Sequence, residues 1–338
     1  MRISIITPAG AHTRHGNRNT ATRWAGFLRA AGHRVELTQE WAEGRADVMI
    51  ALHARRSHDS IARYAQSFPE RPLIVVLTGT DLYRDIQTDA NAQRSLELAT
   101  CLVVLQDRGP LELQPQVRHK ARVIYQSARS IARPAPLSSC FEVVVSGHLR
   151  PEKDPFRAAA ALGHLPVNSR IRVTHIGGAM SAGMQAEAQA WMAKDPRYRW
   201  LGELAHARAL RMLARSRVMV ISSRMEGGAN VVSEALELDV PVVASRIPGN
   251  IGMLGRGYPG YYPLGDERAL AKVLSRAETN ADFYNLLELS CRARAPLVTA
   301  EREAAALTNM LEELTSPNRG GHRANGREPK EERLRRGT

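Results

Sequence analysis

Cysteine and aromatic residues are scarce in this chain of 338 residues. The three cysteines, Cys101, Cys140 and Cys291, are odd in number and widely spaced, which argues against a disulfide framework and against a zinc site. Aromatic residues make up only 5% of the chain and do not alternate with basic residues in any segment, so stacking on single-stranded nucleic acid is unsupported. No apolar run reaches the about 18 residues of a membrane span, and no signal peptide precedes the first strand-like run. We therefore expect a cytoplasmic protein.

Several motifs of ligand and catalytic sites are also missing. The first loop, which ends in Gly16-Asn17, lacks the G-x-G-x-x-G pattern of a dinucleotide fold, and the chain has no Walker loop, no G-x-S-x-G elbow and no His/Cys metal cluster. It also has no Asp-x-Asp pair, the carboxylate pattern with which many nucleotide-sugar enzymes hold a divalent cation. We therefore expect no metal and no cofactor, with positive charge coming from Arg, Lys and helix N-termini.

Charge of one sign dominates the chain. The formal net charge is +13, which suits anionic small substrates and also permits nucleic-acid binding. Part of the excess is peripheral, because Ser316 to Thr338 holds seven Lys or Arg against three Glu and has no apolar periodicity. We expect this basic tail to be disordered.

Strand-like and helix-like segments alternate along the chain, which predicts parallel sheets covered by helices on both faces. A segment with two prolines and many small residues, SARSIARPAPLSS, divides the pattern and reads as a linker. The fold class is therefore α/β, with two doubly wound Rossmann-like domains facing each other across a cleft. The expected boundaries are 1–130 for the N-terminal domain, 131–139 for the linker, 140–315 for the C-terminal domain with its terminal helices, and 316–338 for the tail. The expected strands are 3–7, 35–37, 47–52, 73–77, 101–105 and 122–125, then 141–146, 170–176, 198–201, 218–222 and 241–244, and one expected helix, 109–118, is interrupted by two prolines.

The stretch VMVISSRMEGGANVVSEA, residues 218–235, joins a strand to a helix through a Gly-Gly turn. Backbone amides at such a turn can approach an anion, and the helix dipole favours negative charge there. The amides of Gly228, Ala229, Asn230 and Val231 are therefore candidates for a phosphate cradle. Glu226 and Glu234 flank this turn and are suited to grip ligand hydroxyls; the alternative is an ordinary strand-turn-helix with two solvated glutamates.

The segment Ser146 to Asp154 follows the first strand of the second half and carries two basic residues, Arg150 and Lys153. Their place at the end of that strand lets both point into the cleft, where they can stabilise a departing pyrophosphate. The alternative is two solvated bases on a loop.

Polar residues also follow the strands of the first half. Gly16 and Asn17 precede the first helix and are candidates to bind the donor, while Asn17 and Thr20 can equally be plain helix caps or reach a ligand across the cleft. Further candidates at strand ends, each of which can equally be a structural hydrogen-bonder or a solvated charge, are Arg18, Arg55, Arg56, Thr80 and Asp81.

Together these residues resemble the GT-B glycosyltransferases, in particular the large retaining family marked by two glutamates with seven residues between them, here Glu226 and Glu234. The resemblance runs from about Met1 to Leu314. It implies that Glu226 contacts the donor sugar, that Glu234 holds the ribose and that the amides of 228–231 bind the diphosphate. It departs at one point, because the family's Gly-Arg-Leu reads Gly147-His148-Leu149 here, which shifts the place of the arginine.

Several blocks resemble the selenosugar synthases of selenoneine biosynthesis, a family within these enzymes. They are HGNRNTATRWAGFLRAAGHRV, ALHARRS, LTGTDLYRDI, SGHLRPEKDP, RYRWLGE, MEGGANVVSEA and IPGNIGMLG. This resemblance implies a UDP-sugar donor, UDP-N-acetylglucosamine or UDP-glucose, and selenophosphate as acceptor, with UDP released and a selenosugar formed after loss of phosphate. Because selenium is already a strong nucleophile, little general-base help is needed. The acceptor would then lie among the first-half candidates, Arg18, Thr20, Arg55, Arg56, Thr80 and Asp81.

Two alternatives remain open at this point. One is a GT-B enzyme that glycosylates an alcohol or thiol. The other is a non-catalytic basic protein that binds nucleic acid. Glu226 and Glu234 disfavour this alternative because carboxylates repel phosphate backbones. The sequence leaves the oligomeric state open.

Overall fold

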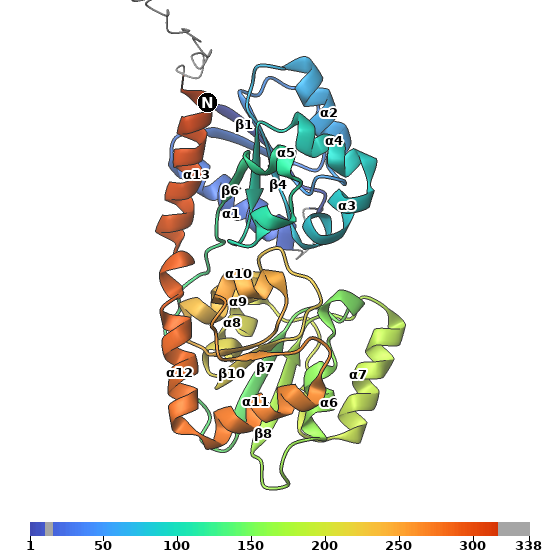
Figure 1. The fold of residues 1–338 in the computed structure, drawn as a ribbon, viewed down its shortest axis with the longest axis vertical. Helices are drawn as coiled ribbons and strands as arrows, with labels where there is room; N and C mark the ends of the chain where they lie inside the picture. The colour runs from blue at the N-terminus through green and yellow to red at the C-terminus, as the bar shows by residue number, and fades with distance from the viewer. Residues whose placement is uncertain (11–15, 317–338) are drawn as a thin grey trace, which may run out of the picture.

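The computed structural model describes residues 1–10 and 16–316, and the predicted disordered tail from residue 317 onward lies outside the described residues. Two six-stranded sheets form two domains that are stacked along the long axis (Figure 1). All strand pairs recorded in both sheets are parallel. The predicted fold class, two Rossmann-like α/β domains, is confirmed.

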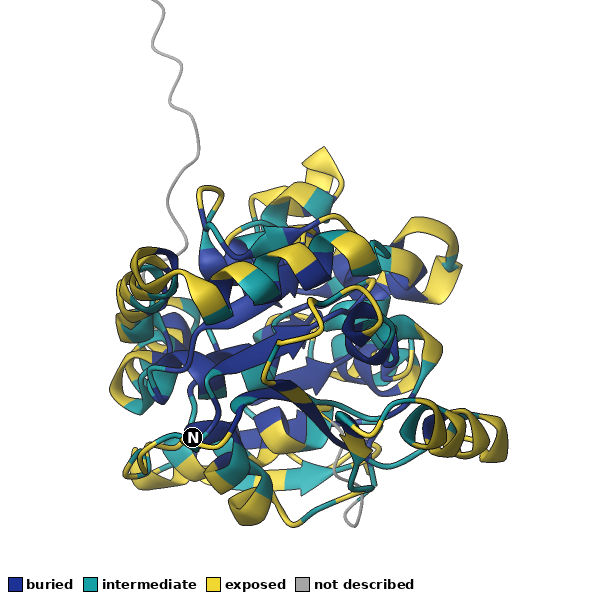
Figure 2. Ribbon diagram, turned by 90° about the horizontal axis from the view of Figure 1, so that it is seen from below, coloured by how far each residue is buried: buried dark blue, intermediate teal, exposed yellow. Residues whose placement is uncertain are grey.

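The N-terminal sheet has the strand order β2-β1-β3-β4-β5-β6. Its central strands are continuous apolar runs, and every residue of Val48–Leu52 is buried, as a parallel sheet with both faces covered requires. Figure 2 shows buried strands in dark blue between helices whose outer faces are exposed. The strands are β1 (Arg2–Ile6), β2 (Arg34–Thr38), β3 (Val48–Leu52), β4 (Leu73–Val76), β5 (Cys101–Val104) and β6 (Ala121–Val123), and the helical segments are α1 (Gly16–Ala30), α2 (His58–Ser67), a π-helix η1 (Asp81–Asp85), α3 (Ile86–Thr88), α4 (Ala90–Leu98), a 3₁₀ turn η2 (Gly109–Glu112) and α5 (Pro115–Arg118).

The C-terminal sheet has the order β12-β11-β10-β7-β8-β9, so β10 and β7 are neighbours at its centre. This adjacency brings together the two loops from which most of the predicted donor-site residues come. The strands are β7 (Phe141–Ser146), β8 (Ile171–Ile176), β9 (Tyr198–Trp200), β10 (Val218–Ile221), β11 (Val242–Ser245) and β12 (Tyr261–Tyr262), and the helical segments are η3 (Pro151–Lys153), α6 (Arg157–Leu162), α7 (Ala182–Lys194), α8 (His206–Ala214), α9 (Asn230–Glu237), α10 (Pro248–Leu254), α11 (Glu267–Thr279), α12 (Ala281–Arg292), η4 (Ala295–Leu297) and α13 (Ala300–Thr315).

Several segments differ from the expected elements, among them the short pieces α3, η3, β12 and η4, which the sequence pattern does not indicate. The expected helix 109–118 is two short pieces, η2 and α5, because a proline occupies the first turn of each. The π-helix η1 and helix α10 were not predicted, since the first lies in a polar loop and the second has two glycines among its seven residues.

The last helix, α13, lies against the N-terminal domain, whereas the boundaries drawn from the sequence group it with the C-terminal one (Figure 1). Its apolar side chains Leu307, Met310 and Leu311 join the N-terminal core beside α1 and the strands. The buried carboxylate of Glu303 accepts hydrogen bonds from Arg23, Trp24 and Ser127. The helix therefore returns to cover a face of the N-terminal sheet, and it ties the start of the linker to α1.

A buried histidine in β8 predicts a pH dependence of stability. His175 is 1% exposed, and its ring nitrogens contact the Tyr198 hydroxyl and the Gly147 carbonyl oxygen, each at 3.1 Å. Burial lowers the pKa of His175 to about 4, from the 6.5 of an unperturbed histidine. Between these two values the unfolded chain binds a proton that the folded chain does not, so the free energy of unfolding falls as the pH falls, by at most about 1.4 kcal/mol per pH unit.

Urea unfolding measured at several pH values between about 6.5 and 4 tests this expectation. The variant His175→Gln has no titrating ring, so we expect its stability to change less over this interval. Equal slopes in the two proteins would contradict the assignment.

Candidate active site

The glycine turn between β10 and α9 packs directly against the N-terminal domain. A Cβ atom on Gly227 would lie 2.6 Å from the backbone of Thr78 and Gly79, which follow β4. A Cβ on Gly228 would lie 2.4 Å from that of Leu105, which follows β5. The carboxyl ends of the strands of both sheets therefore meet at this turn, and the absence of side chains on it permits the close approach of the two domains.

The first amides of α9 provide free hydrogen-bond donors at the same place. Within the described part of the chain, no acceptor is recorded for the backbone N–H groups of Gly228, Ala229, Asn230 and Val231, and the cap residue Ala229 has no side chain that could accept. Asn230 also has a buried Oδ1 without a partner. Free amides at a helix N-terminus have the geometry of an anion site, as the sequence pattern predicts.

Helix α1 starts opposite this point. The position of a Cβ on Gly16 lies 3.7 Å from Asn230 Nδ2, so the N-termini of α1 and α9 approach each other across the domain boundary. Gly16 and Asn17 are thus next to the predicted donor site. Thr20 is buried within α1, where its hydroxyl donates to the Gly16 carbonyl oxygen and accepts from Gln126. Its hydroxyl is therefore engaged in structure.

Lys153 and Glu226 form an ion pair where the two domains meet. The distance from Lys153 Nζ to Glu226 Oε1 is 2.5 Å, and the two side chains are 22% and 9% exposed. Their loops follow the neighbouring strands β7 and β10, and Ser222 Oγ fixes the loop of Lys153 by donating to the carbonyl oxygens of Lys153 and Asp154. The pair thus joins a positive charge to a carboxylate at the carboxyl edge of the sheet.

Arg150 and His148 precede Lys153 on the same loop. Arg150 has a buried Nε for which the described residues provide no partner. His148 Nδ1 accepts a hydrogen bond from the amide of Gly178, and so connects this loop to the one after β8. The histidine therefore occupies the family's arginine position with a structural contact, while Arg150 keeps a free donor near the ion pair.

Glu234 has a partner that the sequence did not indicate. The distance from its Oε1 to His206 Nε2 is 2.8 Å, and the side chains are 17% and 62% exposed. His206 begins α8, so this contact connects the starts of two neighbouring helices. Glu226 faces Lys153 while Glu234 faces His206, so the two glutamates have different surroundings.

Two of the acceptor candidates hold loops of the N-terminal domain together. The carboxylate of Asp81 is buried and accepts from the Thr78 amide and hydroxyl and from the Ala54 amide. Burial raises the pKa of Asp81. The Thr80 hydroxyl lies 3.3 Å from Nε2 of His53, a buried residue with a positive φ of 75°. These contacts fasten the loop after β3 to the loop after β4, and Asp81 has no exposed surface for a ligand.

The arginine candidates differ in their pairing. Arg55 donates to Asp85 at 2.8 Å, and this hydrogen bond raises the pKa of Arg55. Arg56 is exposed and Arg18 is half-buried, and no ion pair is recorded for either of them among the described residues.

Three residues that the sequence did not single out also lie at the domain boundary: Tyr83, Gln106 and Arg108. The side chain of Gln106 donates to the Tyr83 hydroxyl at 3.0 Å and accepts from the Arg108 amide at 2.6 Å. A Cβ on Gly252 of α10 would lie 1.8 Å from Gln106 Oε1, so this side chain contacts the C-terminal domain. No motif assigns these residues a role, since a lone Arg before a Gly-Pro pair is typical of an ordinary loop.

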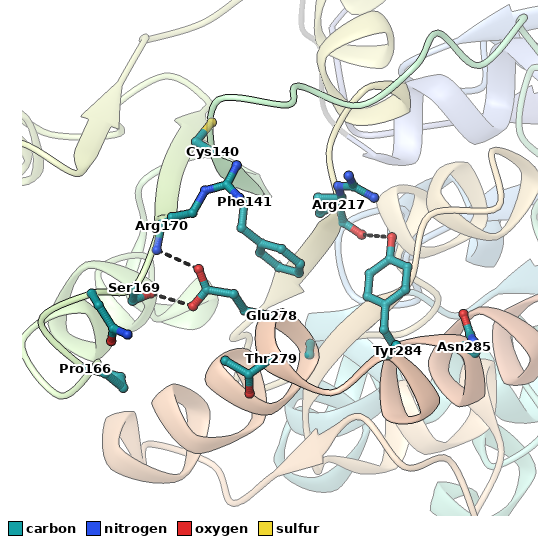
Figure 3. A pocket seen from close by; sticks show the side chains of 13 residues that line it. Cys140, Phe141, Pro166, Ser169, Arg170, Arg217, Glu278, Thr279, Tyr284 and Asn285 are labelled. Carbon is teal, nitrogen blue, oxygen red and sulfur yellow. Dashed lines mark hydrogen bonds between the residues drawn. The ribbon is translucent and has the colours of Figure 1, made fainter.

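A cavity of about 510 Å³ lies elsewhere, at the amino ends of β7 and β8 (Figure 3). Phe141, Arg170 and Tyr284 are among its lining residues, and Glu278 accepts from Ser169 and from the Arg170 amide there. Ligands of open parallel sheets bind at the carboxyl ends of the strands. This cavity is therefore separate from the candidate site.

The described residues contain no group of three or more His, Cys, Asp or Glu side chains arranged to hold a metal ion. Among the same residues, every helix is too short or too polar to cross a membrane.

Comparison with known proteins shows which family and which solved structures the chain is similar to. Residues 136–289 match the family model described as glycosyl transferases group 1. Sucrose-phosphate synthase from Thermosynechococcus elongatus has a similar structure, with a TM-score of 0.75 and 16% identity over 93% of this chain and 98% of that one. Anabaena Alr3699/HepE, solved in complex with UDP and glucose, has a TM-score of 0.74 and 15% identity over 93% of this chain and 100% of that one. A glycosyltransferase from Rickettsia africae ESF-5 has a TM-score of 0.73 and 12% identity over 94% and 99%.

These structural likenesses establish the fold, which is GT-B. The family match covers the C-terminal domain, where the Lys153–Glu226 pair and the start of α9 lie, and this part of the chain is similar to group 1 glycosyl transferases.

Proposed function

We propose that the protein transfers the sugar of a UDP-sugar, UDP-N-acetylglucosamine or UDP-glucose, to the selenium atom of selenophosphate. The observation that carries the proposal is the Lys153–Glu226 pair beside the free amides of α9, opposite arginine-bearing loops of the N-terminal domain. The UDP and glucose seen in the Anabaena relative support a UDP-sugar donor. The many blocks similar to selenosugar synthases support the acceptor, and we place the reaction in the cytoplasm.

In this reaction a lone pair of selenium forms the bond to the anomeric carbon while the bond from that carbon to the UDP oxygen breaks. The electron pair of the broken bond leaves with the β-phosphate of UDP. Water then cleaves the Se–P bond, its oxygen going to phosphorus and its proton to selenium, which leaves a selenosugar and inorganic phosphate.

The protein residues supply binding and charge. Glu226 would contact the sugar, Glu234 the ribose, and the amides of 228–231 the diphosphate. Arg150 and Lys153 would stabilise the negative charge that develops on the departing UDP, which is the largest electrostatic demand of the reaction. We propose that these groups meet that demand without a metal ion.

Product identification tests the proposal. The protein is incubated with a mixture of UDP-sugars and either selenophosphate or a panel of alcohols and thiols, and the products are identified by mass spectrometry. We expect a selenium-containing sugar and UDP only in the first reaction. UDP release with the alcohols or thiols alone would instead support the alternative acceptor class.

A further inference from the structure

Arg108, in the loop after β5, has an unusual guanidinium group. Its Nε and Nη1 are both buried, and neither has a hydrogen-bond partner among residues 1–10 and 16–316. Each of three other arginines, Arg133, Arg150 and Arg215, has one such buried atom, whereas Arg108 has two. Buried charged donors are nearly always paired, because leaving them unpaired costs free energy. An anionic ligand would supply the missing acceptors.

The neighbours of Arg108 place it at the boundary between the domains. Of the residues just before it, Leu105 meets Gly228 and Gln106 meets Gly252. Asp107 lies 3.7 Å from Arg294, also of the C-terminal half. The segment just after it, η2, packs against both η1 and α10. Arg108 is therefore enclosed by the loops that border the cleft.

Tyr83 provides a second donor beside Arg108. Its hydroxyl accepts from Gln106 at 3.0 Å, so its own proton is free to be donated. Burial is the main cause that raises the pKa of Tyr83, with Glu112 and Glu226 adding to it and Arg108 opposing it. The hydroxyl therefore stays protonated. The charges of Arg108 and of the Glu226 carboxylate both affect its pKa. Tyr83 also lies on a π-helix, a distortion often found at functional sites.

We infer that Arg108 and Tyr83 bind the phosphate group of the acceptor on the N-terminal side of the cleft, facing the Lys153–Glu226 pair. This inference rests on the proposed function. The other phosphate in the reaction, the diphosphate of the donor, already has the α9 amides, Arg150 and Lys153 of the C-terminal domain. Arg55 is a weaker candidate because Asp85 neutralises it. When Arg108 and Tyr83 bind the phosphate oxygens of the acceptor, its selenium atom remains free to face the sugar.

Steady-state kinetics with both substrates varied separate the two phosphates. For Arg108→Gln we expect the KM for selenophosphate to rise about tenfold or more, because a charge-assisted contact is lost, while the KM for the UDP-sugar stays within about twofold. Arg108→Lys should recover part of the loss, since it keeps the charge but not the planar fork. Tyr83→Phe should raise the same KM severalfold. The matched control is Arg94→Gln, which removes one exposed positive charge from α4.

An unchanged KM for selenophosphate in Arg108→Gln would overturn the inference. A rise confined to the KM for the UDP-sugar would also overturn it, because Arg108 would then belong to the donor. If Arg108→Gln does not fold, Arg108→Lys and Tyr83→Phe decide by the same criterion.

A binding measurement keeps this inference distinct from the proposed function. Inorganic thiophosphate should raise the Tm of the wild type and of Arg94→Gln but not that of Arg108→Gln, whereas UDP should raise the Tm of all three. If the wild type makes no product from selenophosphate, the proposed function fails, yet a thiophosphate shift that depends on Arg108 still supports the anion site. Equal thiophosphate shifts in the wild type and Arg108→Gln would overturn it.

Discussion

Replacing Glu226 with glutamine is expected to lower kcat/KM for the UDP-sugar by about 100- to 1,000-fold. The carboxylate is only 9% exposed and lies 2.5 Å from Lys153 Nζ, so an amide of the same shape leaves the lysine without its counter-charge. The amide also weakens the hydrogen bonds to sugar hydroxyls that we assign to Glu226. UDP release measured at several donor concentrations gives the effect, and the control is Glu187→Gln, which removes an exposed carboxylate of α7.

Lys153, the partner of Glu226, provides a second test of the role of the ion pair. We expect Lys153→Ala alone to lower turnover about tenfold or more, since one electrostatic contact to the leaving group is worth over about 1.4 kcal/mol. If the two residues act as one unit, the double variant should cost less than the product of the two single effects. Retention of more than about a tenth of wild-type kcat/KM in Glu226→Gln would contradict the assigned role.

The sequence predicts the sheets well because each buried strand is a continuous apolar run, as in Val48–Leu52. The C-terminal part of the site is predictable for a related reason. Its residues lie within two short segments, 146–154 and 226–234, that follow neighbouring strands, so local pattern and the carboxyl-end rule suffice to bring them together.

The remaining features depend on contacts between segments far apart in the chain. Thr20 and Asp81 are typical loop or cap residues in the sequence, but their partners Gln126 and Ala54 come from other elements. The apolar face of α13 indicates that the helix packs on something, yet not on which of the two sheets. Arg108 is notable only because the described residues around it provide no hydrogen-bond acceptor for its Nε and Nη1. No sequence pattern indicates such an absence.

The sequence predicts an anion cradle at the glycine turn. The structure shows that Gly227 must also lack a side chain because it lies directly against the loop after β4. We expect Gly227→Ala to lower kcat/KM about 100-fold, because a misplacement of about 1 Å at a reacting centre can cost that much. The added methyl would lie 2.6 Å from Gly79 N and from the Thr78 carbonyl carbon. Both are backbone atoms, so no side-chain rotation relieves the contact and the domains must move apart.

Separation of the domains should affect UDP binding and the chemical step to different extents. UDP contacts assigned to Glu234 and the α9 amides lie within the C-terminal domain, so the Kd for UDP, measured by calorimetry, should change by only about twofold. The chemical step needs groups from both domains, so kcat should fall most. The matched control is Gly26→Ala in α1, where the added methyl would meet none of the described residues within 4 Å apart from the helix's own neighbouring backbone. That variant should keep full activity and gain up to about 1 kcal/mol of stability, because alanine favours a helix. Full activity in Gly227→Ala would mean that the reaction does not require the contact between Gly227 and the loop after β4.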